Sequence, residues 1–196
     1  MEKLMKTSKN LDFFFSVMQK IIIVAVAIVL ITTVALTFLS GDTVGGGIID
    51  IGGVQFDISD EFAPVKKDFL VYTWIMVTLL ILIVTVIYYM FSIIRKILQP
   101  MKEGCPFDKS VGYNTRKIAN ATIILGILAN TVSAVQTVGA ILVFRFSELF
   151  AEGAVEKVTA HLSFDVTFFV VYFILLLISH VFIYGAELQK LSDETL

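Results

Sequence analysis

The stretch from Phe69 to Ile94, FLVYTWIMVTLLILIVTVIYYMFSII, contains no charged residue. A helix needs about 20 apolar residues to cross roughly 30 Å of hydrocarbon, and this stretch is longer than that. Three more apolar stretches of similar length cover residues 21–39, 118–144 and 166–185. A segment in lipid must satisfy its own backbone hydrogen bonds, so helices are favoured despite the many β-branched residues. The sequence therefore predicts an all-α integral membrane protein with four transmembrane helices.

The composition points the same way. Of the 196 residues, 57% are hydrophobic and only 16% are charged, whereas soluble domains average roughly 25% charged residues. The formal net charge of −2 provides no basic surface for nucleic acid, so we expect no direct nucleic-acid binding. Cys105 is the single cysteine, which excludes an intrachain disulfide and a zinc site built from paired thiolates.

Basic residues predict the orientation in the membrane, because cytoplasmic loops are enriched in Lys and Arg. The N-terminal segment, the loop 95–117 and the tail 186–196 together hold eleven basic residues. The loops 40–68 and 145–165 hold only four. We therefore expect both termini in the cytoplasm. The stretch 21–39 is longer than the apolar core of a signal peptide, so it is interpreted as a retained membrane anchor.

The first outer loop contains an alternating apolar and polar pattern on both sides of a Gly-Gly pair, which is typical of a β-hairpin. We expect a small extracytoplasmic hairpin cap that turns at Gly52-Gly53, supported by a short amphipathic helix in the loop 145–165. The apolar face of this hairpin would carry Ile49, Ile51, Val54, Phe56 and Ile58.

The cytoplasmic loop contains two expected helix breaks, at Pro100 and at Gly104-Cys105-Pro106. Asp108 stands where an N-cap residue would begin the next helix. The basic residues of this loop are expected to meet anionic lipid headgroups. Cys105 is interpreted as an ordinary free cysteine, with a redox or lipidation site as the alternative.

Small and polar residues recur at helical spacing in the third apolar stretch. This arrangement is typical of close helix–helix packing in lipid, so we expect this helix to be the most buried of the four. The alternative is a ligand or ion pathway along the same face. The residues concerned are Gly126, Asn130, Ser133, Gln136 and Thr137.

His180, Tyr184 and Glu187 are spaced to share one face of the fourth helix near its cytoplasmic end. A histidine titrates near neutral pH, so this face is a candidate proton relay. The simpler interpretation is a histidine at headgroup level that bonds to a neighbour. No metalloprotease, hydrolase or P-loop motif occurs in the sequence, so we expect neither enzymatic activity nor a cofactor or metal.

Two segments carry a resemblance to a known family. They are Gly104-Cys105-Pro106-Phe107-Asp108, and Tyr184-Gly185-Ala186-Glu187-Leu188-Gln189 together with the ending Ser192-Asp193-Glu194-Thr195-Leu196. With four apolar stretches in this length, the chain resembles the bacterial membrane proteins grouped as domain of unknown function 2975. The resemblance implies a protein of the bacterial cytoplasmic membrane without assigned activity. Genes of such proteins often neighbour a gene for a small helix-turn-helix regulator, which implies a regulatory role.

The sequence thus predicts a membrane-embedded signalling protein that presents its cytoplasmic loop and tail to a soluble partner. The alternatives are a small transporter or channel-like subunit that works as a homo-oligomer, and a structural or immunity-type protein. For the tail itself, a competing interpretation is that Asp193 or Glu194 pairs with Arg95, Lys96 or Arg116 of the chain's own loop. The candidate docking residues are Phe107, Asp108, Arg116, Glu187, Leu188, Gln189, Asp193 and Glu194.

Overall fold

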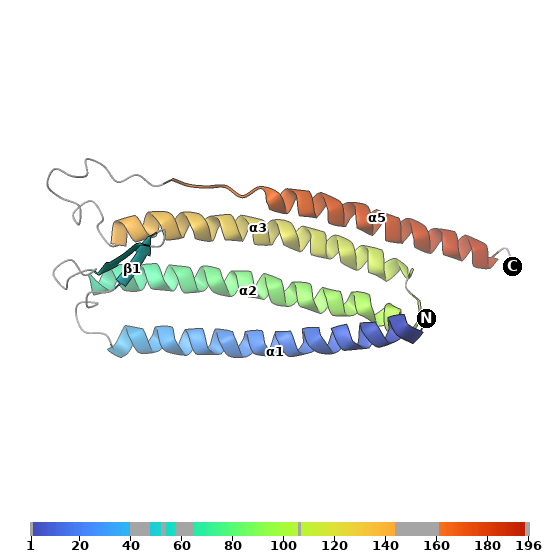
Figure 1. Ribbon diagram of the computed structural model, residues 1–196, viewed down its shortest axis with the longest axis horizontal. Coiled ribbons are helices and arrows are strands. Elements are labelled where there is room, and N and C mark those ends of the chain that lie inside the picture. The colour runs from blue at the N-terminus through green and yellow to red at the C-terminus, as the bar shows by residue number, and fades with distance from the viewer. Residues whose placement is uncertain are drawn as a thin grey trace. The chain divides into compact units, whose positions relative to one another are not determined.

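The computed structural model describes residues 2–39, 48–51, 54–57, 65–105, 107–143 and 161–194 (Figure 1). Within these residues, four helices are long and apolar enough to cross a membrane, so the chain is a multi-pass membrane protein. The helices are α1 (Glu2–Leu39), α2 (Lys66–Lys102), α3 (Lys109–Val143) and α5 (Thr167–Glu194).

The helices extend well beyond the apolar stretches from which they were predicted. The 37 residues of α2 span about 55 Å at 1.5 Å per residue, against about 30 Å of hydrocarbon. Hydropathy marks only the part of a helix that lies in lipid, and the charged turns continue the same backbone hydrogen bonding outside it. These extensions carry most of the charged residues of the chain.

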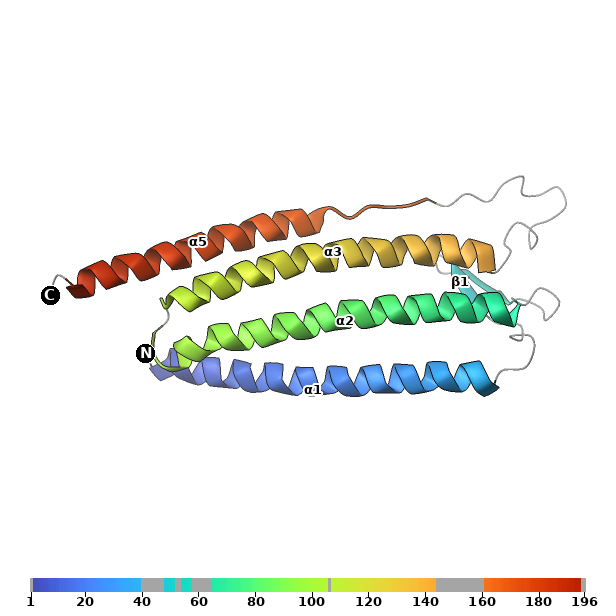
Figure 2. The same cartoon turned by 180° about the vertical axis from the view of Figure 1, so that it is seen from behind.

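The chain divides into two compact units. Unit 1 comprises Met1–Val26, Leu82–Ala129 and Asp165–Leu196, and unit 2 comprises Ala27–Ile81 and Asn130–Phe164. The first three helices therefore contribute to both units, while α5 lies wholly in unit 1. Within unit 1, α5 runs beside the first half of α3, as both ribbon views show (Figures 1 and 2).

Two short strands lie between α1 and α2. Strand β1 (Ile48–Ile51) pairs antiparallel with β2 (Val54–Asp57), and Ile51 stands opposite Val54. This register places Gly52 and Gly53 between the strands, where the alternation predicts the turn. These two glycines lie outside the described residues, as do residues 144–160, for which a short amphipathic helix was predicted.

The connection between α2 and α3 is closed by backbone hydrogen bonds. The predicted break at Pro100 is wrong, because α2 continues to Lys102 with the proline in its last turns. Pro100 lacks only its own N–H, and its carbonyl oxygen accepts a hydrogen bond from the Cys105 N–H at 3.0 Å. Gly104 has φ +83° and bonds back to Met101, which completes a Schellman motif. The second predicted break, at 104–106, coincides with this motif.

Aspartates cap the starts of α3 and α5. The Asp108 carboxylate accepts a hydrogen bond from the Ser110 N–H at 2.7 Å, as the sequence predicted. Asp165 does the same for Thr167 at 2.8 Å. The hydrogen bonds from Ser110 and Thr167 lower the pKa of each capping carboxyl below its ordinary value.

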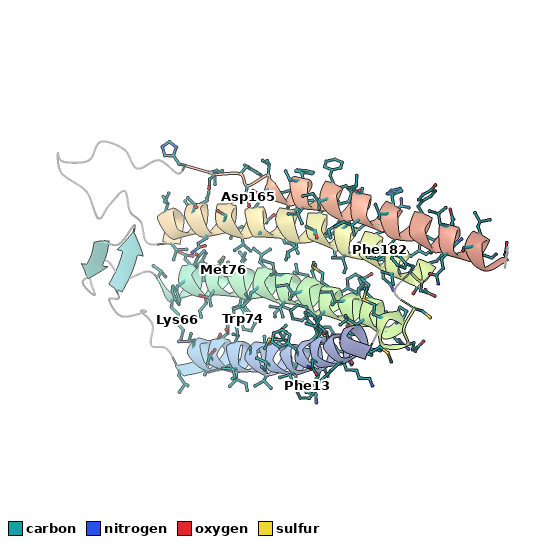
Figure 3. All side chains as sticks on the ribbon, turned by 45° about the vertical axis from the view of Figure 1, so that its right-hand side comes forward. Phe13, Lys66, Trp74, Met76, Asp165 and Phe182 are labelled. Carbon is teal, nitrogen blue, oxygen red and sulfur yellow. The ribbon has the colours of Figure 1, made fainter. Side chains whose placement is uncertain are left out.

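Large apolar side chains cover the outside of the helices, as expected for a protein in lipid. Phe13 and Trp74 are examples (Figure 3). Among the described residues, α3 has more buried positions than any other helix, and they lie between Val111 and Ala121. The face that led to the expectation of a buried third helix, from Gly126 to Thr137, is only half-buried.

Candidate functional site

A polar network joins α1 to α2 in unit 1. One oxygen of the Asp12 carboxylate lies 2.8 Å from Arg95 Nε, and the other lies 2.6 Å from Lys102 Nζ. Arg95 and Lys102 are seven residues apart, so they lie on the same face of α2, two turns from each other. All three side chains are partly shielded from solvent. One carboxylate therefore holds two cations in fixed positions.

The network continues toward the apolar part of the helices through Gln19. Arg95 Nη1 donates to Gln19 Oε1 at 3.0 Å, and Gln19 Nε2 donates to Ser92 Oγ at 2.8 Å. Gln19 is buried, so its amide needs these partners. The sequence motifs did not predict a site at Asp12, Gln19 or Ser92. The spacing of Asp12 and Gln19 could have indicated the network, because residues seven positions apart lie on the same face of a helix.

A pocket of about 340 Å³ opens beside this network. Three basic side chains and one acidic side chain line it, so its charge is positive at neutral pH. The lining residues are Asp12, Ser92, Arg95, Lys96, Gln99 and Lys102.

The turn between α2 and α3 contacts the end of α5. Phe107 lies against Gly185, where an added Cβ would be 3.3 Å from the phenyl ring. The Phe107 ring centroid is also 6.4 Å from that of Phe182. Lys109 Nζ lies 3.2 Å from Glu187 Oε1, and both of these side chains are about half exposed. The turn and the tail therefore meet at the same end of unit 1.

Arg95 bonds to Asp12 and Gln19 of α1. One tail acid, Glu187, pairs with Lys109 of the loop. The expected pairing of Asp193 or Glu194 with Arg95, Lys96 or Arg116 stays a prediction. Glu194 pairs with Lys190 of its own helix at 3.5 Å. The Asp193 side chain lies outside the described residues. The other predicted docking residues are exposed: Phe107, Asp108, Arg116, Leu188 and Gln189.

The crossing of α3 and α5 is very close. Ser179 is fully buried, and its Oγ donates to the Gly112 carbonyl oxygen at 2.8 Å. A Cβ added at Gly112 would lie 2.5 Å from Ile183 Cγ1 and 3.0 Å from the Ser179 carbonyl oxygen. Gly126, predicted as a packing residue, receives the Phe168 ring. Small residues thus allow the close approach, as the packing interpretation requires.

The predicted polar row of α3 is only partly on one side. Asn130, Ser133 and Thr137 are half-buried, and Thr137 Oγ1 donates to the Ser133 carbonyl oxygen at 2.9 Å. Gln136 is exposed, so its placement on the same side is wrong. The helical rotation of about 100° per residue carries it away from the row.

The candidate relay of α5 faces outward. His180, Tyr184 and Glu187 are all exposed. His180 Nδ1 lies 2.8 Å from the Leu176 carbonyl oxygen, within its own helix, and Glu187 pairs with Lys109. The contacts described for His180 and Glu187 therefore go to Leu176 and Lys109. This favours a histidine at headgroup level that bonds to a neighbour over a proton relay.

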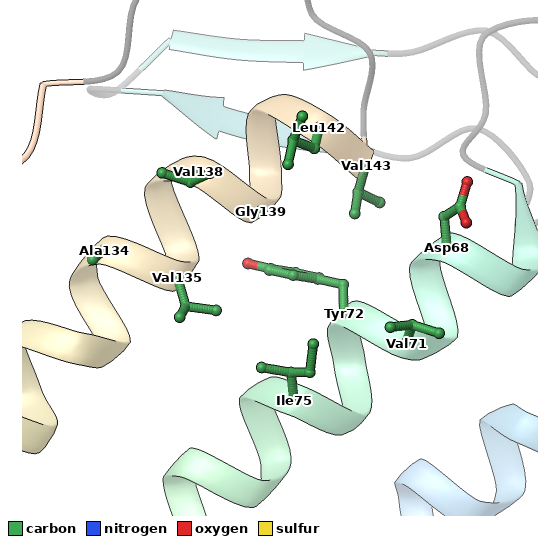
Figure 4. A pocket seen from close by; sticks show the side chains of 10 residues that line it. All are labelled: Asp68, Val71, Tyr72, Ile75, Ala134, Val135, Val138, Gly139, Leu142 and Val143. Carbon is green, nitrogen blue, oxygen red and sulfur yellow. The ribbon is translucent and has the colours of Figure 1, made fainter.

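Unit 2 contains a cavity of about 500 Å³ between α2 and α3 (Figure 4). The Tyr72 ring lies over Gly139, where an added Cβ would be 2.5 Å from the ring. Asp68 is the one charged lining residue, and aliphatic side chains form most of the wall. The lining residues are Asp68, Val71, Tyr72, Ile75, Ala134, Val135, Val138, Gly139, Leu142 and Val143.

Within the described part of the chain, no group of three or more His, Cys, Asp or Glu side chains is placed to hold a metal ion. Cys105 is exposed and carries a free thiol. No known protein family, curated protein or solved structure matches this chain.

Proposed function

We propose that this chain is a regulatory protein of the bacterial cytoplasmic membrane that presents its 95–117 loop and its tail to a soluble cytoplasmic protein. The observation that carries this proposal is the exposed apolar strip at the end of α5. Leu188 and Leu191 are 48% and 59% exposed. They lie beyond Gly185, where the long apolar stretch of α5 ends. Apolar side chains exposed outside the hydrocarbon are typical of interaction surfaces.

The charges beside this strip favour a basic partner. The tail carries Glu187, Glu194 and Asp193 but only Lys190 as a basic residue. Phe107 is exposed and contacts Gly185, so it extends the apolar surface toward the loop. A small DNA-binding regulator has the matching charge, and the resemblance to the domain of unknown function 2975 family implies such a partner.

Contact between the tail and the turn provides a simple way to control docking. The ion pair between Lys109 and Glu187 is exposed, and such pairs contribute only about 0–1 kcal/mol. A partner can therefore displace it at little cost. In this proposal the strand pair β1–β2 forms a cap at the outer face, where the signal would be received.

Site-specific photocrosslinking in cells tests the docking surface. A crosslinking amino acid at Leu188 or Leu191 should give an adduct with one soluble protein, identified by mass spectrometry. Val181 provides the matched control, because it is also exposed on α5 but lies within the apolar stretch. Adducts at Leu188 and Leu191 that contain only lipid or a second copy of this chain would contradict the proposal.

The orientation is tested separately with alkaline phosphatase fusions. A fusion at Asp57 should be active, since the enzyme folds only outside the cytoplasm, and a fusion at Leu196 should be inactive. The reverse result would place the tail outside the cell and exclude a cytoplasmic partner.

A transporter or channel-like oligomer is the second candidate. The half-buried Asn130, Ser133 and Thr137 of α3 favour it, because polar groups in lipid often mark a pathway. Solute or ion flux into liposomes that contain the purified chain would support this function, particularly if Asn130→Leu abolished the flux.

A further inference from the structure

We infer that the pocket between α1 and α2 in unit 1 binds the phosphate headgroup of an anionic phospholipid. The pocket stands at the level where the apolar stretches end. Ser92 at its inner side belongs to the uncharged stretch that ends at Ile94, and Arg95 follows directly. On α1, Gln19 and Lys20 immediately precede the apolar stretch that begins at Ile21. Lipid headgroups occupy this level of a bilayer.

Arg95 and Lys102 have more donors than their bonds to the described residues use. Arg95 has five N–H donors, and the bonds to Asp12 and Gln19 employ one at Nε and one at Nη1. Lys102 has three donors, and the bond to Asp12 employs one. Lys96 adds a further ammonium group to the wall. A phosphate oxygen that enters the pocket can therefore accept several charge-assisted hydrogen bonds.

Asp12 organises these donors but does not neutralise them. With Arg95, Lys96 and Lys102 opposed by one carboxylate, the pocket carries a net charge of +2. Because Asp12 and Gln19 already fix the Arg95 side chain, little conformational entropy is lost when a ligand binds. A basic pocket between transmembrane helices is a known arrangement for anionic headgroups.

The surroundings of the pocket favour a lipid over a soluble phosphate compound. Phe13 and Phe14 follow Asp12 directly and are 72% and 51% exposed. Both rings lie on α1 within one turn of Asp12 without lining the pocket, and exposed phenyl rings are costly in water and favourable next to acyl chains. A phospholipid satisfies both features at once, since its phosphate meets the cations and its chains meet the rings.

Native mass spectrometry of the full chain in detergent tests this inference. Dioleoylphosphatidylglycerol should remain bound at concentrations where dioleoylphosphatidylcholine does not. Lys96→Gln removes one ammonium group without touching the bonds of Asp12, so it should weaken phosphatidylglycerol binding about tenfold, as expected for the loss of one charged hydrogen bond. Lys117→Gln is the matched control: it removes the same charge from an exposed site of unit 1 outside the pocket, and it should leave binding nearly unchanged.

Three results would overturn the inference. The first is equal retention of phosphatidylcholine, and the second is an equal loss of binding in the Lys117 and Lys96 variants, which would indicate general charge attraction. The third is displacement of the lipid by millimolar inorganic phosphate, which would identify a site for a soluble anion. If Lys96→Gln does not fold, Lys96→Arg keeps the charge and should retain phosphatidylglycerol binding, and loss of binding in that folded variant would also contradict the inference.

Discussion

The helices of the two units are joined by different kinds of contact. In unit 1, Asp12 bonds to two cations of α2, and Ser179 bonds to the backbone of α3 at Gly112. In unit 2, α2 and α3 meet through the Tyr72 ring over Gly139, beside an apolar cavity. Lipid provides no hydrophobic force between helices, so packing and polar bonds determine their association. Among the contacts described for each unit, directional polar bonds therefore link the helices of unit 1, while the crossing of α2 and α3 in unit 2 is formed by a ring that packs over a glycine.

The largest effect is expected from adding a methyl group at the α3–α5 crossing. In Gly112→Ala the new Cβ would lie 2.5 Å from the Ile183 side chain and about 3 Å from two backbone atoms of α5, which cannot turn aside, so we expect a loss of about 2–3 kcal/mol in unfolding free energy. The matched variant Gly139→Ala meets only the Tyr72 ring, which can move into the cavity, and should lose less than about 1 kcal/mol. Denaturation in mixed micelles measures both. Equal losses would contradict the distinction between the units.

Removing the central carboxylate of unit 1 should have the next largest effect. Asp12→Asn leaves Arg95 and Lys102 without their anion, and we expect a loss of about 1.5 kcal/mol, the value typical of hydrogen bonds to charged groups. Asp68→Asn, in unit 2, is the control and should change stability little. Thermal unfolding in detergent compares the two variants, and an Asp68 variant as unstable as the Asp12 variant would argue against a special role for the network.

A smaller effect is expected within the α3 portion of unit 2. Asn130→Leu removes a half-buried polar side chain and should cost about 1 kcal/mol, typical of hydrogen bonds between membrane helices. Gln136→Leu changes an exposed residue six positions along the same helix and should be nearly neutral. If the two variants unfold alike, polar packing does not distinguish the faces of α3.

The smallest effect should come from the exposed ion pair between the turn and the tail. Glu187→Gln should lower the unfolding free energy by less than about 0.5 kcal/mol, and salt should reduce this difference further. Glu194→Gln removes an i,i+4 pair of similar exposure and serves as the control. A loss above 1 kcal/mol at Glu187 would mean that the tail is locked in place and cannot exchange partners.

The fold could be predicted largely from the sequence, because hydropathy and length alone identify a helix in lipid. The limits of the helices were less predictable, since α1 begins at Glu2 and not near Ile21. The Asp108 cap was predictable because an N-cap depends on local hydrogen bonds. The strand pair was predictable from its alternation and its glycines.

The polar network was harder to predict, because it depends on which helices are neighbours. Asp12 and Lys102 are ninety residues apart in the chain, and only their three-dimensional arrangement brings them together. Arg95 was one of three basic residues expected to pair with the tail, because charge alone does not select among the acids that could reach it. Gly112 and Ser179 were also not predicted, because the role of a single small residue depends on which helix packs against it.

The Schellman turn at Gly104 has a consequence for how the protein is made. It leaves only residues 103–108 between the end of α2 and the start of α3, so these helices are joined as an αα-hairpin. A nascent chain with such a short connection presents two adjacent apolar helices to the insertion machinery almost together. We therefore expect α2 and α3 to enter the bilayer as a pair, with α5 added afterwards against a surface that already exists.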